Sequence, residues 1–279
     1  MSATEAIGTI GATAVRVSPQ WLALRESADA AARSADLAER LADHLAGRDR
    51  LVIHDLGGGT GAMGRWLAPR LAGPQQWTVH DRDADLLDLA VARAAAPGPA
   101  ADGATVTVEA RLSDIARLTP DDPAGADLIV ASALLDILSA DELRTILEVA
   151  TAIDGCALLL ALTVTGRTVL TPADPLDARI GAAFNAHQRR LLGPDAVAAA
   201  AQQLRATGAE VLIASSPWTL GAADADLTAE WLEGWVAAAI EQEPVLAAEA
   251  AAYRDVRLAQ AAAGELAVTV DHADLLVLP

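Results

Sequence analysis

The sequence contains one cysteine, no lysine and few aromatic residues, and each shortage excludes a class of protein. The single cysteine, Cys156, excludes an internal disulfide framework and a zinc site built from cysteines. Aromatic residues make up 3% of the chain, so aliphatic side chains must fill its core. No run of about 18 uncharged apolar residues occurs, so we predict no membrane span. The first residues, Met1–Glu5, lack the basic and apolar regions of a signal peptide, and we therefore expect a cytoplasmic protein.

The charge balance is strongly negative. The 20 basic residues, all arginine, are scattered among 38 acidic residues, and the net charge is −18 at pH 7. A surface that follows a phosphate backbone needs clustered cations, so we expect no nucleic-acid partner. The five histidines form no H-E-x-x-H or similar pattern, and we predict no metal site.

The chain is organised around the stretch Leu51–Gly64. It opens with a run of strand-forming residues over 51–56 and continues with glycine at four of the next five positions, 57, 58, 59 and 61. A helical pattern with apolar periodicity follows over 62–71. Strand, glycine turn and helix in this order are typical of the start of a nucleotide-binding βαβ unit, where bare main chain approaches the ligand.

Two glycine patterns overlap in this stretch. Gly59-x-Gly61-x-x-Gly64 fits the fingerprint of dinucleotide-binding proteins. Asp55-x-Gly57-x-Gly59-x-Gly61 resembles motif I of the class I S-adenosylmethionine (SAM)-dependent methyltransferases. A carboxylate before the turn suits the ammonium and sulfonium of SAM and would repel a pyrophosphate. We therefore predict a SAM-dependent methyltransferase. An NAD(P)-dependent oxidoreductase and a non-catalytic SAM- or nucleotide-binding protein remain the alternatives.

The remaining chain alternates between strand and helix patterns. Strands are predicted at 51–56, 77–81, 104–110, 126–132, 156–164, 210–216 and 265–277. Outside 62–71, helices are predicted at 21–45, after 81, at 140–153, 176–192 and 194–207, around Trp231 and Trp235, and at 244–263, with a loop at 167–175. The resemblance implies a Rossmann-like α/β fold. Its mostly parallel seven-stranded sheet has helices on both faces, and its last strand is antiparallel beside the fifth. We expect an N-terminal helical lid or extension at 1–47 and a methyltransferase domain at 48–279, with helical insertions at about 166–208 and 217–263.

The cofactor residues are predicted from the ends of the first four strands. Asp81 lies 20 residues after Gly61, where a carboxylate can accept hydrogen bonds from both ribose hydroxyls, although it could also cap a helix. By resemblance, Asp114 would contact the adenine amino group and Ser132 the nucleoside edge, although Asp114 could equally be a turn residue. The full predicted set is Asp55, Gly57, Gly59, Gly61, Asp81, Arg82, Ser113, Asp114 and Ser132.

The acceptor residues are predicted from segments outside the sheet. Trp21 and Arg25 share one helix face, as do Trp231 and Trp235, and plain helix packing is the alternative for both pairs. We predict Trp21, Trp231 and Trp235 in the acceptor pocket, with Arg25 and His187 as its polar, catalytic groups.

Two methyltransferase subclasses are excluded by motif. The stretch after the fourth strand, Ser132–Leu135, lacks the Pro-Pro-aromatic motif of nucleic-acid amino-methylating enzymes. Cys156 does not follow the fourth strand, as the nucleophile of cytosine C5 enzymes would. We therefore predict a small-molecule acceptor, S-adenosylhomocysteine (SAH) as product, and a monomer or homodimer.

Overall fold

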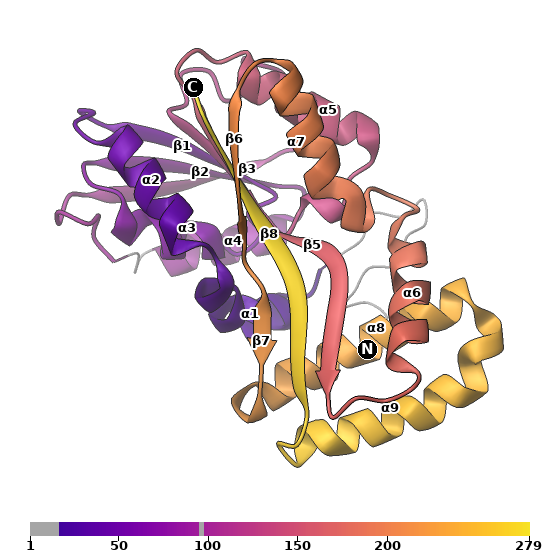
Figure 1. Cartoon of the computed structure of the whole chain (residues 1–279). Coiled ribbons are helices and arrows are strands. Elements are labelled where there is room, and N and C mark those ends of the chain that lie inside the picture. The colour runs from indigo at the N-terminus through magenta and orange to yellow at the C-terminus, as the bar shows by residue number, and fades with distance from the viewer. Residues whose placement is uncertain (1–16, 95–97) are drawn as a thin grey trace.

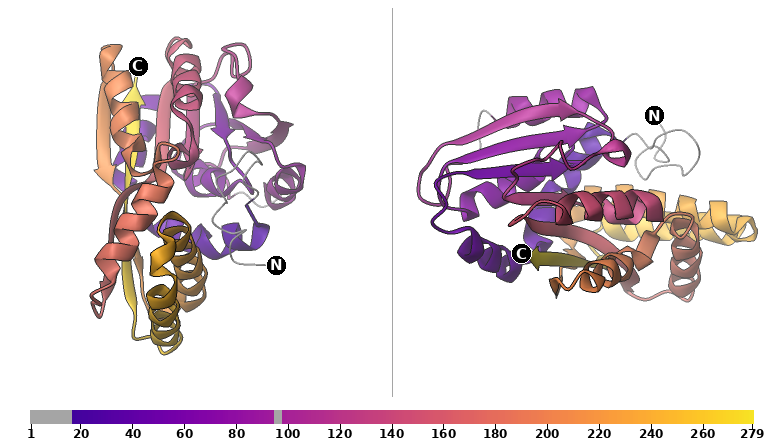
Figure 2. Two further views of the ribbon diagram at one scale, coloured as in Figure 1. Left: turned by 90° about the vertical axis from the view of Figure 1, so that its right-hand side faces the viewer. Right: turned by 90° about the horizontal axis from the view of Figure 1, so that it is seen from above.

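The computed structural model describes residues 17–94 and 98–279. In this part of the chain eight strands form one sheet with helices on both faces (Figures 1 and 2). The strands are β1 (Leu51–Leu56), β2 (Gln75–Asp81), β3 (Val106–Leu112), β4 (Leu128–Ser132), β5 (Ala157–Thr171), β6 (Glu210–Ser215), β7 (Trp218–Leu220) and β8 (Ala267–Leu278). Their order is β3-β2-β1-β4-β5-β8-β6, with β7 paired to β8.

Strands β1 to β5 are parallel, and β8 runs antiparallel to β5, β6 and β7. The predicted Rossmann-like sheet, with its last strand antiparallel beside the fifth, is confirmed. The predicted count of seven strands was one short, because the segment Trp218–Leu220 pairs with β8 as an additional strand. Predicted ends of the third, fourth and last strands differ from the observed ones by one or two residues.

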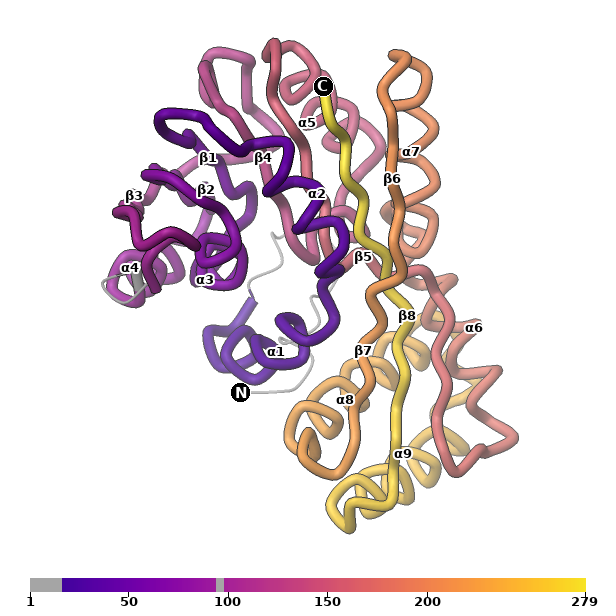
Figure 3. Tube along the Cα trace, turned by 60° about the vertical axis from the view of Figure 1, so that its left-hand side comes forward, coloured from indigo at the N-terminus to yellow at the C-terminus, as the bar shows by residue number. Residues whose placement is uncertain are grey.

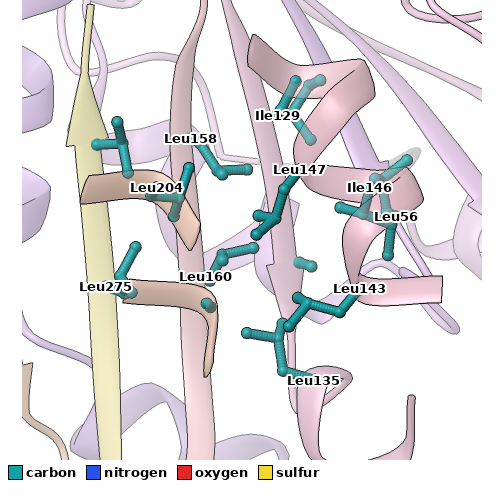
Figure 4. Close-up of a cluster of buried hydrophobic side chains, with 14 of the residues drawn as sticks. Leu56, Ile129, Leu135, Leu143, Ile146, Leu147, Leu158, Leu160, Leu204 and Leu275 are labelled. Carbon is teal, nitrogen blue, oxygen red and sulfur yellow. The ribbon is translucent and has the colours of Figure 1, made fainter. Parts of the chain in front are cut away.

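Helices cover the sheet in two layers, set by the alternation of side chains along the strands. Ile129, Leu158 and Leu160 face α5 (Ala140–Thr151) and α7 (Ala196–Ala206), as Figure 4 shows in part. Leu128 and Leu159 face the opposite way, toward α2 (Ala35–Leu45) and α3 (Ala62–Leu67). The helix α4 (Ala84–Ala94) packs on β2 and β3. Both faces of the central strands are therefore buried, as a parallel sheet requires.

The predicted N-terminal helix at 21–45 is two helices, α1 (Pro19–Ala32) and α2. Ser34 causes the break, because its hydroxyl caps α2 by accepting a hydrogen bond from Leu37 N. The backbone N–H of Ser34 in turn donates to Asp274 Oδ2 of β8 at 2.8 Å. The break thus fastens the N-terminal helices to the sheet.

The fifth strand is longer than predicted, and much of the expected loop at 167–175 is strand. Residues as far as Thr171 pair with β8, where Thr171 opposes Ala267. The distal halves of β5 (163–171) and β8 (267–273) together with β7 form what we call the arm (Figure 3). The helices α6 (Asp177–Gln188), α8 (Ala225–Gln242) and α9 (Ala247–Ala262) lie around the arm. They share a separate hydrophobic core with it.

Six described segments are single 3-10 turns, of which η4 (Leu135–Ile137) and η5 (Gly193–Asp195) matter below. Within residues 17–94 and 98–279, no helix combines the length and apolar content needed to cross a bilayer.

Candidate active site

The glycine turn between β1 and α3 takes backbone angles that favour glycine. Gly57, Gly59 and Gly61 have φ values of 63°, 53° and 77°. Gly58 is needed for a different reason, because a Cβ there would lie 2.6 Å from Asp55 Oδ2. The turn therefore folds directly over the Asp55 side chain at the end of β1.

Asp55 is fully buried, and both of its carboxylate oxygens lack a hydrogen-bond partner among the described residues. Burial raises the pKa of Asp55 to about 7, the charge of Asp81 adds to the rise, and the charge of Arg33 opposes it. A buried carboxylate without a donor is costly, and this cost points to a ligand group that completes the site.

Arg33 is the site residue that the sequence analysis missed. It lies between α1 and α2, is 5% exposed, and donates from Nη2 to Ser132 Oγ at the end of β4, at 3.1 Å. Its Nε and Nη1 have no partner in the described part of the chain. The guanidinium lies 5.5 Å from the ring centroid of Trp66. Burial lowers the pKa of Arg33, and the nearby charges of Asp29 and Asp55 are among those that raise it.

Asp81 ends β2 beside the glycine turn. Its Oδ2 accepts a hydrogen bond from Gly59 N and its Oδ1 one from Asp83 N, both at 2.9 Å. Arg82 follows it as an exposed residue. The carboxylate holds the turn in place and keeps a lone pair on each oxygen for other donors.

Ser113 and Asp114 follow β3 at the same edge of the sheet. The hydroxyl of Ser113 contacts His80 Nδ1 at 3.0 Å, and His80 Nε2 lies 2.8 Å from His54 Nδ1. Asp114 caps η3 (Ile115–Arg117) by accepting from Ala116 N at 3.1 Å. The predicted cofactor residues of β1 to β4 therefore gather where the carboxyl ends of these strands meet.

Helix α1 lies over the glycine turn. A Cβ on Gly59 would be 3.1 Å from Leu22 Cδ1 of α1. Glu26 of α1 accepts two hydrogen bonds from Arg65 of α3, at 2.7 and 2.8 Å, and Arg65 also donates to Thr60 O of the turn. The N-terminal helix is thus held against the turn by an ion pair of fixed geometry.

Residues 53–153 match the model of a family described as a methyltransferase domain. The match covers the glycine turn and β2 to β4, and over these residues the chain is similar to a methyltransferase domain. Among solved structures, the YcgJ protein of Bacillus subtilis is 12% identical with a TM-score of 0.50, covers 88% of this chain and 99% of its own, and shares the fold. A SAM-dependent methyltransferase of Thiobacillus denitrificans in complex with SAH is 17% identical, with a TM-score of 0.48. The similarity covers 94% of this chain and 99% of that enzyme. Another SAM-dependent methyltransferase, from Geobacter sulfurreducens and also in complex with SAH, is 18% identical, with a TM-score of 0.45. Here too the similarity covers 94% of this chain and 99% of the other. No curated protein matches the chain.

Trp21 and Arg25 of α1 meet Trp218 of β7. The Arg25 guanidinium lies 5.7 Å from the Trp21 ring centroid and 5.0 Å from that of Trp218. Arg25 also donates two hydrogen bonds to Asp29, at 3.0 and 3.2 Å, and Trp218 Nε1 donates to Asp29 Oδ1 at 2.9 Å. The charge of Arg25 is therefore compensated by Asp29.

The other predicted acceptor residues lie in the helices around the arm. Trp231 and Trp235 stack with ring centroids 5.1 Å apart, and both are buried in the core of the arm. His187 is buried, with Nδ1 3.0 Å from Gln188 Oε1 and Nε2 3.4 Å from Glu241 Oε2. The structure thus brings Trp21 and Arg25 together. Trp21 also belongs to the same buried hydrophobic cluster as Trp231 and Trp235, where α1 contacts α8.

Proposed function

We propose that this protein transfers a methyl group from SAM to a small-molecule acceptor and releases SAH. The observation that carries the proposal is a pair of buried charged groups beside the glycine turn, Asp55 and Arg33. In the described part of the chain, neither Asp55 oxygen and neither Nε nor Nη1 of Arg33 has a partner. An α-amino acid group offers an ammonium to the first and a carboxylate to the second, so one ligand can satisfy both.

SAM and SAH carry such an amino acid group attached to adenosine, and NAD(P) does not. A pyrophosphate in this place would be repelled by Asp55. For the nucleoside end of SAM, we propose that Asp81 accepts hydrogen bonds from the ribose hydroxyls and that Asp114 binds the adenine amino group. The remaining contacts to the nucleoside are proposed for Arg82, Ser113 and Ser132. Gly57, Gly59 and Gly61 let the main chain approach the ligand.

When bound, SAM supplies an activated methyl group whose sulfonium is already a good leaving group. The task of this chain is therefore to hold the acceptor in line with the methyl group and to exclude water. We propose that the described part of the predicted segment 1–47, the helices α1 and α2, acts as a lid over the methyltransferase domain at 48–279, and that Trp21 and Arg25 line the acceptor side of the pocket. Residues 1–16 of that segment lie outside the described residues. Trp231, Trp235 and His187 are proposed as further acceptor contacts from the helices of the arm.

Calorimetric titration with SAH and with 5′-methylthioadenosine, which lacks the amino acid group, tests the proposal. Arg33→Met should weaken SAH by about 2–3 kcal/mol, roughly 30- to 150-fold, because a charge-assisted pair is lost. It should leave 5′-methylthioadenosine unchanged. Asp81→Ala should weaken both ligands, because both carry the ribose. Arg40→Met serves as the control, since Arg40 is an exposed arginine of α2.

Equal loss of both ligands in Arg33→Met would refute the amino acid subsite. Micromolar binding of NAD by the wild type together with no binding of SAM would refute the proposed function as a whole.

A further inference from the structure

Asp136 lies in η4, the short helix that directly follows β4. The turn into η4 passes through Ala133, whose φ of 53° is rare for a residue with a side chain and whose N–H donates to Ala161 O at 2.9 Å. Leu134 packs against the glycine turn, since a Cβ on Gly57 would lie 3.0 Å from Leu134 Cδ1. Asp136 is therefore held at the carboxyl edge of the sheet, where α/β proteins bind their ligands.

Asp136 is less buried than the leucines around it. Leu134, Leu135 and Leu138 are buried in the hydrophobic cluster that packs on α5 and α7, whereas Asp136 is half-buried. Among the described residues, the hydrogen bond to its carboxylate comes from its own backbone N–H. The carboxylate consequently has acceptor capacity left for a ligand.

Burial raises the pKa of Asp136, and the charge of Arg25 in α1 lowers it. The elements packed against η4 are η5, β5 and α7. The charged side chains of these three elements are Asp195, Arg167 and Arg205. Asp195 pairs with Arg189 and Arg167 pairs with Asp271, whereas Arg205 lies in the last turn of α7. Among the described residues, the charge that reaches Asp136 from outside these elements is that of Arg25.

We propose that Asp136 is a catalytic carboxylate, which accepts the proton of the acceptor's N–H or O–H group as that nitrogen or oxygen takes the methyl group. This inference rests on the proposed function. A lone pair of the acceptor atom forms the new bond to the methyl carbon. The carbon–sulfur bond of SAM breaks, and its electron pair stays on sulfur, which becomes the neutral thioether of SAH. The acceptor proton moves to a carboxylate oxygen of Asp136 and then to water.

The position suits a general base because burial raises the pKa of Asp136 to about 6, although the charge of Arg25 works in the opposite direction. A carboxylate with a pKa near neutrality is a stronger base than an ordinary one and is still ionised at pH 7.

The same charges define the class of acceptor. Arg25 is already compensated by Asp29, to which it donates two hydrogen bonds. An anionic acceptor would meet the Asp136 carboxylate without a free cation from Arg25 to offset it, and would be disfavoured. The acceptor is therefore an amine or a hydroxyl compound whose reacting atom is neutral and carries a lone pair.

Methylation assays with radiolabelled SAM and a panel of small amines, phenols and alcohols test the inference, and mass spectrometry of the products separates N- from O-methylation. With any probe that is methylated, Asp136→Asn should reduce kcat at least 100-fold while SAH affinity stays within threefold. At saturating SAM, the wild-type kcat/KM for the probe should rise with pH through a limb near pH 6, and the variant should lack this limb. Asp136→Glu should restore part of the rate.

Asp141→Asn is the matched control. Asp141 is an exposed carboxylate in the first turn of α5, the helix that follows η4. A variant Asp136→Asn that keeps both the rate and the limb near pH 6 would overturn the inference while leaving SAM binding intact. A wild-type protein that binds SAM and methylates none of the probes would overturn the proposed acceptor class. Failure to bind SAM would instead refute the proposed function.

Discussion

Asp55→Asn should stabilise the protein measured without ligand, and the gain should grow with pH. In the folded protein the pKa of Asp55 is raised from 3.8 to about 7, chiefly by burial. Between these two values the folded state holds a proton that the unfolded state has lost. Folding stability from this group is therefore complete at low pH and falls as the pH rises toward 7.

The size of the effect follows from the width of that window. Each pH unit inside it changes the free energy of unfolding by 1.36 kcal/mol, so the interval from pH 5 to pH 7 amounts to about 3 kcal/mol. The difference in unfolding free energy between Asp55→Asn and the wild type should widen by about this amount from pH 5 to pH 8. For a chain of this size that is a shift in Tm of roughly 6–10 °C.

Urea unfolding followed by circular dichroism at several pH values measures the difference. Comparing the variant with the wild type at each pH removes the contributions of His54, His80 and His272, whose pKa values burial lowers to about 4. Saturating SAM should reverse the order at pH 8, because the ligand ammonium pairs with the ionised wild-type carboxylate. If the difference in unfolding free energy between variant and wild type does not change with pH, the reasoning is refuted. Asp55 would then have the same pKa in the folded and the unfolded state.

Two further substitutions test how the N-terminal helices α1 and α2 are held. Glu26→Gln should remove the ion pair with Arg65 and raise the rate of hydrogen exchange in α1, with little change in β1, as mass spectrometry can measure; uniform protection of α1 in both proteins would contradict this role. Asp274→Asn should lower the free energy of unfolding by about 1–3 kcal/mol in urea titrations, because Asp274 accepts hydrogen bonds from Leu162 N, Ser216 Oγ and Ser34 N, and an amide cannot accept all three. An unchanged unfolding midpoint would show that these bonds are replaced by others.

The central βαβ unit could be predicted because its signals are local. The apolar run of β1, the four glycines and the periodicity of α3 each lie in a short window, and Asp81 follows at a spacing that the fold itself dictates. The mostly parallel sheet with its last strand antiparallel beside the fifth then followed from the resemblance, and the pairing of β8 with β5 confirms the place of that strand.

The missed features depend on contacts between distant segments. Nothing around Arg33 separates it from a solvated arginine, and its burial arises only when the break at Ser34 directs it toward Ser132. The length of β5 depends on its pairing with β8, about 100 residues later, so a local pattern ended it too early. Asp136 stands in an apolar stretch where a single acid resembles a surface position, and its place beside the glycine turn depends on the turn at Ala133.

The strand β5 contributes to the hydrophobic clusters on both faces of the parallel sheet and to the cluster of the arm, and its bulges separate the first two from the third. From Leu160 to Thr163 it advances three residues while β8 advances two, and from Val164 to Thr168 it advances four while β8 again advances two. The extra residues of β5 bend this strand, and its pairing with β8 resumes in a shifted register after each bulge. As a consequence, the register of β1 to β4 does not depend on the length or content of the arm. The arm meets the glycine turn through α1 instead, because this helix packs on β7 and α8 and also lies over the turn. A change in the helices of the arm would therefore reach the glycine turn by way of α1 and not through the strands.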